Sequence, residues 1–319
     1  MSLTAPLRGV VPPVCTPFDS DGEVDTGSLA RLVGHLVDSG VHGLFALGST
    51  SEVAYLTDEQ RATALETVVR TADGRVPVLA GVIDTTTARV TAHARTAAAL
   101  GADALVATAP FYTRTHPKEI ARHFRGLREA VDLPLFAYDL PVSVHSKLSA
   151  ALVRELAEES TLAGLKDSSG DEGGLRRLIV ELGGRDGRDR GAAPRFSILT
   201  GSELTVDAAL LAGADGVVPG LGNVDPAGYV RLYDAARAGD WARAAAEQER
   251  LVELFAMVDA GPEADMSRSS SALGSFKEAL RLLGVVGNGV TAFPQIPLSA
   301  ESVAQVARRL RDAGLPPVR

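Results

Sequence analysis

The feature of this chain that most restricts its fold is a regular alternation of short apolar segments with longer amphipathic ones. Each apolar segment is rich in β-branched residues and has the length of a buried strand, whereas the amphipathic segments have the spacing of helices. Strands that alternate with helices pair in parallel, because each helix carries the chain back to the edge where it started. Eight such strands are predicted, at residues 10–18, 43–48, 76–82, 102–110, 134–141, 162–168, 196–201 and 216–220. We therefore predict an α/β fold of the (β/α)8 TIM-barrel class.

The helical segments between these strands agree with a barrel. Clear examples span residues 25–39, 58–72, 86–100, 117–130 and 149–158, and several begin with Asp, Ser or Thr, the residues that cap helix N-termini. The alternative is a doubly wound open sheet, which has fewer strands and a glycine-rich dinucleotide turn after the first one. Here the first strand ends in Cys-Thr-Pro-Phe at 15–18. The barrel is therefore the better interpretation.

The strand pattern ends near Gly239, and helical patterns follow at 240–260, 271–283 and 299–313. We predict a barrel domain at 1–239 and a C-terminal three-helix domain at 240–319. The segment 183–194 is polar and glycine-rich and reads as a surface insertion, to which we assign no function.

Composition restricts the partners of this 319-residue chain. Its formal net charge of -8 disfavours nucleic acid and anionic lipid. Cys15 is the single cysteine, so neither internal disulfides nor thiolate zinc sites are expected, and the beginning MSLTAPLRGV lacks the apolar core of a signal peptide. Since no apolar run reaches membrane-spanning length, we expect a cytoplasmic protein without a membrane or nucleic-acid partner.

Lysine is rare in this chain. Of its 32 basic residues only four are lysines: Lys118, Lys147, Lys166 and Lys277. An amine can lose its proton inside a protein, whereas a guanidinium cannot, so a retained lysine can indicate chemistry. Lys118 at a helix start, Lys147 in a loop and Lys277 on an amphipathic helix are expected to be solvated. Only Lys166 lies inside a predicted strand.

Lys166 and Tyr138 are the main candidates for catalysis. Both lie near the carboxyl ends of neighbouring predicted strands, where TIM-barrel enzymes carry their reactive groups. Burial in the barrel lowers the pKa of an ammonium, and a neutral amine attacks ketones. Tyr138 could exchange protons with the resulting carbinolamine. The alternatives are an ion pair of Lys166 with Asp139 or Asp167, and a core tyrosine with a satisfied hydroxyl.

A polar loop follows the second predicted strand. Gly48 to Ser51 offers backbone N–H groups and three hydroxyls, which suit the carboxylate of a keto acid. Polar turns after strands are common, so an ordinary turn is the alternative.

Four motifs, in this order, resemble those of the dihydrodipicolinate synthase and N-acetylneuraminate lyase family. They are GSTSE at 48–52, APFY at 109–112, YDLP at 138–141 and GLKDSSG at 164–170. The resemblance extends from VCTPF at 14–18 through GADGVVPGLGNV at 213–224 to the C-terminal helices. It implies a lyase in which Lys166 forms a Schiff base with pyruvate and Tyr138 carries protons, without a metal or organic cofactor.

The resemblance also implies roles for other residues. Ser49 matches the hydroxyl of a proton relay between tyrosines, and Thr50 matches a binder of the pyruvate carboxylate. Tyr112 matches a tyrosine that synthases insert into the site of a neighbouring subunit, which implies a homo-oligomer, either a dimer or a tetramer. Gly48 and Val218 match positions around the substrate.

The chain departs from the family pattern at two positions. Ser51 replaces the usual glycine of the loop, which can narrow the site or alter the backbone. Ser143 occupies the substrate position where synthases place an arginine for the carboxylate of the aldehyde, and nearby His145 lacks the planar fork of arginine. We therefore favour an aldolase that acts on pyruvate and a polyhydroxylated aldehyde, such as a 2-keto-3-deoxy sugar acid aldolase. Condensation of pyruvate with aspartate semialdehyde is the alternative.

Three rival functions are weaker. A metal-dependent aldolase needs clustered ligands, whereas the histidines are dispersed: His35, His42, His93, His116, His123 and His145. A phosphate-binding barrel could use Gly201-Ser202 and residues 220–223. A non-catalytic ligand-binding protein of the same fold would have no use for a buried amine, an adjacent phenol and the loop hydroxyls together.

Overall fold

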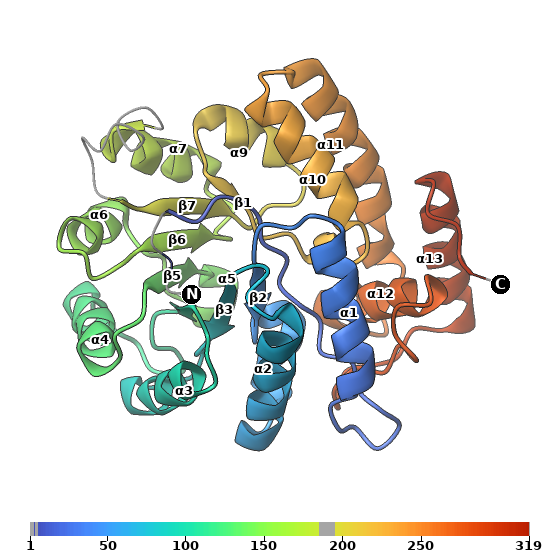
Figure 1. Ribbon diagram of the computed structural model, residues 1–319, viewed down its shortest axis with the longest axis horizontal. Helices are drawn as coiled ribbons and strands as arrows, with labels where there is room; N and C mark the ends of the chain where they lie inside the picture. The colour runs from blue at the N-terminus through green and yellow to red at the C-terminus, as the bar shows by residue number, and fades with distance from the viewer. Residues whose placement is uncertain (1–2, 4–5, 185–194, 319) are drawn as a thin grey trace.

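The computed structural model describes residues 3, 6–184 and 195–318. Eight parallel strands follow one another in the order β1-β8-β7-β6-β5-β4-β3-β2, with helices around them (Figure 1). The strands are β1 (Gly9–Val10), β2 (Leu44–Ala46), β3 (Val78–Gly81), β4 (Ala104–Ala107), β5 (Leu135–Asp139), β6 (Gly164–Asp167), β7 (Ser197–Thr200) and β8 (Gly216–Val217). The ring is completed where Pro13 bridges Phe45, with Val14 N–H donating to the Phe45 carbonyl. The predicted TIM barrel is confirmed.

The regular strands are shorter than the sequence predicts. The first was expected over 10–18, yet β1 ends at Val10 and only isolated bridges continue it. The reason is the prolines at 12, 13 and 17, which have no N–H to donate to a neighbouring strand.

Helices surround the barrel and extend beyond it. The barrel helices are α1 (Thr26–Asp38), α2 (Asp58–Ala72), α3 (Thr87–Ala99), α4 (Pro117–Ala130), α5 (Pro141–Val144), α6 (Ala150–Glu158), α7 (Glu172–Glu181), α9 (Val206–Ala212) and α10 (Pro226–Arg237). Single 3-10 turns are η1 (Ser49–Ser51), η2 (Val53–Tyr55), η3 (Gly220–Asn223) and η4 (Ala256–Asp259). The chain ends in α11 (Trp241–Phe255), α12 (Arg268–Leu282) and α13 (Ala300–Asp312). The C-terminal helices agree closely with the three predicted ones.

Alternation along the strands separates two hydrophobic cores. On β5, Leu135 and Ala137 face the helices, whereas Phe136 and Tyr138 face the barrel interior. The interior is filled so tightly that a Cβ on Gly164 would lie 2.3 Å from the Phe136 ring. The outer core continues without a break into α11, α12 and α13, so the division of the chain at residue 239 stays a prediction.

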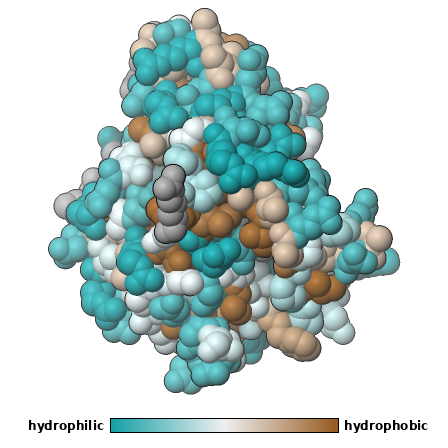
Figure 2. Space-filling model, turned by 90° about the vertical axis from the view of Figure 1, so that its right-hand side faces the viewer, coloured by the Kyte–Doolittle hydropathy of each residue, from teal (hydrophilic) through white to brown (hydrophobic). Residues whose placement is uncertain are grey.

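Figure 2 shows the surface on the side of the C-terminal helices, where apolar residues gather near the centre of a largely hydrophilic face. In the part of the chain that is described, no helix is long and apolar enough to span a membrane. The predicted insertion at 183–194 lies outside the described residues from residue 185 onward.

Candidate active site

Lys166 lies on β6 with its side chain in the barrel interior. It pairs in register with Tyr138 on β5 and Leu199 on β7, both of which belong to the inner core, while its neighbour Leu165 faces the helices. Only 6% of Lys166 is exposed. Strand alternation, read from the sequence, therefore places this amine correctly inside the carboxyl end of the barrel.

Two aromatic rings surround the amine of Lys166. Its Nζ lies 4.0 Å from the centroid of the Tyr138 ring and 5.0 Å from that of Phe45. The two carboxylates considered as ion-pair partners make other contacts. Asp139 pairs with Lys147 and accepts the Leu148 N–H, and Asp167 accepts the Ser169 N–H at 2.8 Å. Lys166 is thus stacked against aromatic rings, and the ion-pair alternative does not describe its surroundings.

The surroundings of Tyr138 lower the pKa of its hydroxyl. Burial, the largest influence, raises its pKa, but the Lys166 charge and hydrogen bonds with Ser49, Lys166 and Ser168 outweigh burial and lower the pKa. The hydroxyl lies 3.4 Å from Ser49 Oγ. The structure therefore brings Lys166, Tyr138 and Ser49 together, as the sequence predicted.

The loop at 48–52 is held firmly in place. Ser51 Oγ donates to the Val14 carbonyl at 2.6 Å and accepts the Gly48 N–H, while Thr16 Oγ1 donates to the Ser51 carbonyl. Ser51 is 1% exposed, so the side chain that departs from the family pattern anchors the loop to the segment after β1. A Cβ on Gly48 would lie 2.7 Å from the Phe45 ring, which explains the glycine.

The remaining predicted residues occupy different surroundings. Val218 is buried in the inner core after β8, and Thr50 is half-buried next to Ser49. Ser143 is exposed on α5, the short helix after β5. Tyr112 follows β4 with a left-handed backbone (φ 75°) and is 92% exposed. Within the described residues, Tyr112 is not gathered with Lys166 and Tyr138.

One prediction about the lysines is wrong. Lys277 was expected to be solvated, yet it is 2% exposed and forms a buried ion pair with Glu52, the last residue of the loop at 48–52. An amphipathic pattern shows which face of a helix is polar, but cannot reveal that a carboxylate from a distant loop covers it. Sequence reasoning missed both residues, and the scarcity of lysine was the one available signal.

A cavity of about 170 Å³ lies beyond the ends of β6 and β7, between these strand ends and the start of α7. Its wall is rich in acidic and hydroxyl groups: Asp167, Ser168, Gly170, Asp171, Glu172, Leu175, Thr200, Gly201 and Ser202. Such a wall offers hydrogen bonds to a polyhydroxylated molecule and no cation to an anionic one.

The turn after β8 does not offer free amides for phosphate. The N–H groups of Gly220 and Leu221 donate to the carboxylate of Glu203, at 2.9 and 3.0 Å, and the Tyr229 hydroxyl donates to it as well. Burial, the largest influence, raises the pKa of Glu203 to about 7 against these hydrogen bonds. A phosphate here would compete with a carboxylate, which counts against the phosphate-binding alternative.

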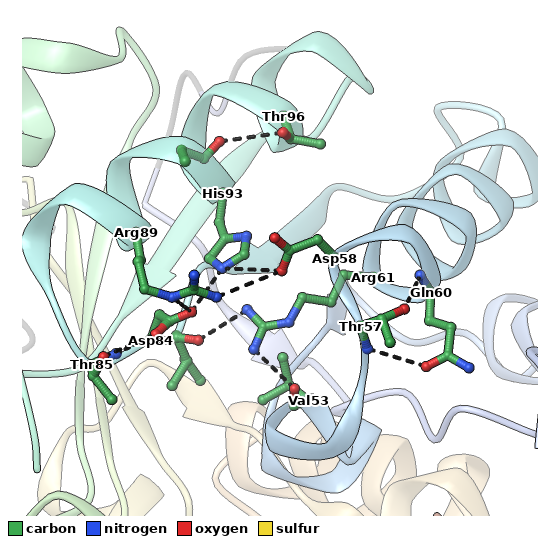
Figure 3. Close-up of polar contacts among 12 residues, drawn as sticks. Val53, Thr57, Asp58, Gln60, Arg61, Asp84, Thr85, Arg89, His93 and Thr96 are labelled. Atoms are coloured by element: carbon green, nitrogen blue, oxygen red, sulfur yellow. Dashed lines mark hydrogen bonds and ion pairs between the residues drawn. The ribbon is translucent and has the colours of Figure 1, made fainter.

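Outside the barrel mouth, a polar network connects the segment after β3 with α2 and α3 (Figure 3). Asp84 accepts hydrogen bonds from Arg89 at 2.8 Å and contacts His93 Nε2 at 3.0 Å. Burial raises the pKa of Asp84, but its hydrogen bonds outweigh burial and lower it to about 2. Arg61 donates to the carbonyls of Val53 and Ile83, and so connects η2, which follows the loop at 48–52, with the segment after β3. The described part of the chain contains no group of three His, Cys, Asp or Glu side chains that could hold a metal ion.

Comparisons with known proteins agree with this arrangement. The sequence model of the dihydrodipicolinate synthetase family matches residues 6–313. The chain is 32% identical over 313 residues to the 4-hydroxy-tetrahydrodipicolinate synthase of Phenylobacterium zucineum, covering 97% of this chain and 98% of the relative. It is 34% identical over 258 residues to the "Putative 2-dehydro-3-deoxy-D-gluconate aldolase YagE" of Escherichia coli, covering 80% and 82%.

A solved structure matches along the whole length. The crystal structure of YagE from Escherichia coli, in complex with pyruvate, superposes with a TM-score of 0.87 and 31% identity, covering 98% of this chain and 100% of that one. Fold and matches together define a carbon–carbon lyase built on a TIM barrel. More narrowly, the chain belongs to the dihydrodipicolinate synthetase family.

Proposed function

We propose that this protein is a class I aldolase in which Lys166 forms a Schiff base with pyruvate or a closely related 2-keto acid. The observation that carries the proposal is the buried amine, 4.0 Å from the Tyr138 ring, with the Tyr138 hydroxyl 3.4 Å from Ser49. A nucleophile, a proton carrier and an orienting hydroxyl thus meet at the carboxyl end of the barrel.

In the proposed reaction, the Lys166 amine attacks the keto carbon and a water molecule leaves as the iminium forms. The iminium withdraws electrons from the bond between the third and fourth carbons of the aldol. This bond breaks to leave an enamine on Lys166 and a free aldehyde. In the direction of condensation the same bond forms from the enamine and the aldehyde. Tyr138 carries protons to and from the carbinolamine and the substrate hydroxyl, and its lowered pKa eases this transfer. No metal or organic cofactor takes part in this scheme.

We assign the carboxylate of the keto acid to the loop after β2. Thr50 is half-buried beside Ser49, on a loop whose backbone is fixed by Ser51. A preformed loop binds without a large loss of conformational freedom. Gly48 lets this loop pack closely on the Phe45 ring at the edge of the substrate site, and Val218 provides an apolar wall.

For the acceptor, we propose a neutral polyhydroxylated aldehyde, so that a 2-keto-3-deoxy sugar acid is the aldol. Ser143 supports this choice, because it stands where synthases place an arginine and offers no cation to an acceptor carboxylate. Similarity to YagE, whose name describes an aldolase of this kind, points the same way. Aspartate semialdehyde is the second candidate, favoured by similarity to a synthase over 97% of the chain.

We further propose that the protein is a homo-oligomer, a dimer or a tetramer. Tyr112 is 92% exposed in a left-handed conformation that is unfavourable for a residue with a Cβ, which supports a role completed by a second copy. Light scattering at several protein concentrations tests this, and a monomer at all of them would refute it.

Borohydride trapping tests the Schiff base. The protein is incubated with pyruvate and borohydride, digested, and its peptides are weighed by mass spectrometry. We expect a stable mass increase on the Lys166 peptide and none on the Lys277 peptide, since the second buried lysine serves as an internal control. If Lys166 takes up no pyruvate, the proposal fails and a non-catalytic ligand-binding role gains support.

A substrate panel then identifies the acceptor. Sugar-acid aldols and aspartate semialdehyde with pyruvate are assayed under the same conditions. We expect cleavage of a sugar-acid aldol to be faster than consumption of aspartate semialdehyde. The reverse order would make the protein a synthase.

A further inference from the structure

Lys277 and Glu52 form the most enclosed ion pair of the described structure. Their side chains are 2% and 0% exposed. The Lys277 amine also donates to the Val290 carbonyl at 2.8 Å and lies 4.1 Å from the centroid of the Phe18 ring. Burial, the largest influence, lowers the pKa of Lys277 in spite of the Glu52 charge. This second buried lysine is absent from the proposed reaction.

Glu52 connects three distant segments of the chain. Besides Lys277 on α12, its carboxylate accepts the Ala292 N–H at 2.7 Å and the Gln295 side-chain amide at 2.6 Å. Glu52 itself directly follows η1, the turn that contains Ser49 and Thr50. The C-terminal part of the chain therefore holds one end of the loop assigned to the keto-acid carboxylate.

The backbone on both sides of this loop is strained. Leu47 and Glu52 both have φ of 59°, a left-handed conformation that residues with a Cβ seldom adopt. Such conformations persist only where surrounding contacts fix them. Leu47 is held by its place at the end of β2, whereas Glu52 is held by the contacts of its side chain.

Stability alone gives little reason to bury such a pair. The cost of removing two charges from water often exceeds their attraction, and a buried pair can often be replaced by apolar residues without loss of stability. The ion pair does fix the position of Glu52, and Glu52 in turn fixes the position of η1, which precedes it. The Ser49 hydroxyl, 3.4 Å from Tyr138, depends on that turn.

We propose that Lys277 is a positioning residue, which acts through Glu52 to hold Ser49 and Thr50 where they bind the keto-acid substrate. The proposal rests on the function proposed above for the loop. It assigns to α12, outside the barrel, a part in substrate affinity.

The decisive variant is the double substitution Glu52→Gln with Lys277→Met, which leaves no unpaired charge buried. Thermal unfolding establishes that it is folded. We expect the pyruvate concentration for half-maximal borohydride trapping to rise about tenfold, a typical size for coupling between sites. At saturating pyruvate, trapping of Lys166 should reach the same final extent, because the amine and Tyr138 are unchanged. Lys118→Met, which removes an exposed lysine on α4, is the matched control and should change neither quantity.

The outcomes separate the two proposals. If the native protein is not trapped at all, the proposed function fails, and this is known before any variant is compared. If the native protein is trapped and the folded double variant has an unchanged half-maximal concentration, Lys277 is merely structural and the inference is wrong. Glu52→Gln alone provides a second variant, expected to shift the half-maximal concentration in the same direction. No shift in that variant would likewise overturn the inference.

Discussion

The two loops beside Lys166 are anchored in different ways. The loop at 48–52 is fixed by buried groups, namely Ser51 on the Val14 carbonyl and Glu52 on Lys277. The segment after β5 is held by Asp139, which accepts one buried N–H from Leu148 and pairs with Lys147, whose side chain is 40% exposed; this segment presents Ser143 to solvent. Because buried contacts define a position more narrowly than exposed ones, the first loop suits an invariant partner and the second a variable one.

This difference corresponds to the two halves of an aldol reaction. We assign the keto-acid half, common to the proposed reactions, to the side whose geometry is fixed. We assign the acceptor half, which distinguishes aldolases from synthases, to the side that is exposed. The chain can therefore keep its chemistry while the acceptor changes.

The largest effect on turnover is expected at Lys166, which takes part in both halves of the proposed reaction. Lys166→Arg keeps the charge and removes the nucleophile, so turnover should fall at least about 10³-fold. Steady-state rates with the aldol identified by the substrate panel measure this loss, and circular dichroism checks that the fold is retained. Activity close to that of the native protein would place the nucleophile elsewhere.

The next largest effect is expected on the free energy of unfolding, when each loop loses the lysine that holds it. Lys277→Met leaves Glu52 charged and buried, and should lower the free energy of unfolding by about 3–5 kcal/mol. Lys147→Met should cost about 1 kcal/mol, because Lys147 is partly exposed to solvent.

Urea unfolding of both variants at neutral pH measures this contrast. Equal losses would show that exposure does not distinguish the two loops.

A smaller effect concerns the pH dependence of stability that Glu203, the carboxylate at the turn after β8, confers. Burial raises the pKa of Glu203 to about 7, above its ordinary value of 4.5, so the folded protein binds this proton more tightly than the unfolded chain. The resulting stabilisation is complete below about pH 4.5 and is lost as pH rises through 7, a decrease of roughly 3 kcal/mol.

Free energies of unfolding at pH 5 and pH 8 test this prediction. Glu203→Gln carries no charge at either pH, so its decrease should be smaller than that of the native protein. Equal decreases in both proteins would assign the pH dependence to other groups.

The smallest effect is expected from Ser143→Arg, which should change the preference for the acceptor and leave pyruvate binding almost unchanged. The new guanidinium would lie on the exposed α5 and could pair with an acceptor carboxylate, so relative activity on aspartate semialdehyde should increase, by up to about tenfold. Pyruvate trapping of Lys166 should stay within about twofold of the native protein. A large change in trapping would show that the two halves are not independent.

The sequence predicted the barrel because its two periodicities are local. Alternation along a strand assigns Lys166 and Tyr138 to the interior, and parallel strands bring both to the same end. That much requires no knowledge of distant contacts. The short regular part of the first strand also has a local cause, the prolines, although the expected boundary overlooked them.

Contacts between segments that are distant in the sequence could not be predicted from local patterns. Nothing near Lys277 in the sequence indicates that Glu52 covers it, so its predicted exposure was wrong. Ser51 suggested a narrowed site or an altered loop backbone, and nothing near it in the sequence indicated that its hydroxyl donates to the distant Val14 carbonyl. Pairing of this kind depends on the packed barrel, which periodicity cannot describe.

The contacts of Glu52 also bear on the order in which the protein is completed during synthesis. Gln295, which donates to its carboxylate, lies 243 residues further along the chain. A nascent chain that has emerged only as far as α11 already contains Lys166, Tyr138 and Ser49, but none of the partners that hold Glu52. The barrel would therefore possess its reactive amine well before it possesses a finished binding loop, and translation of the final helices would bring the site into working order.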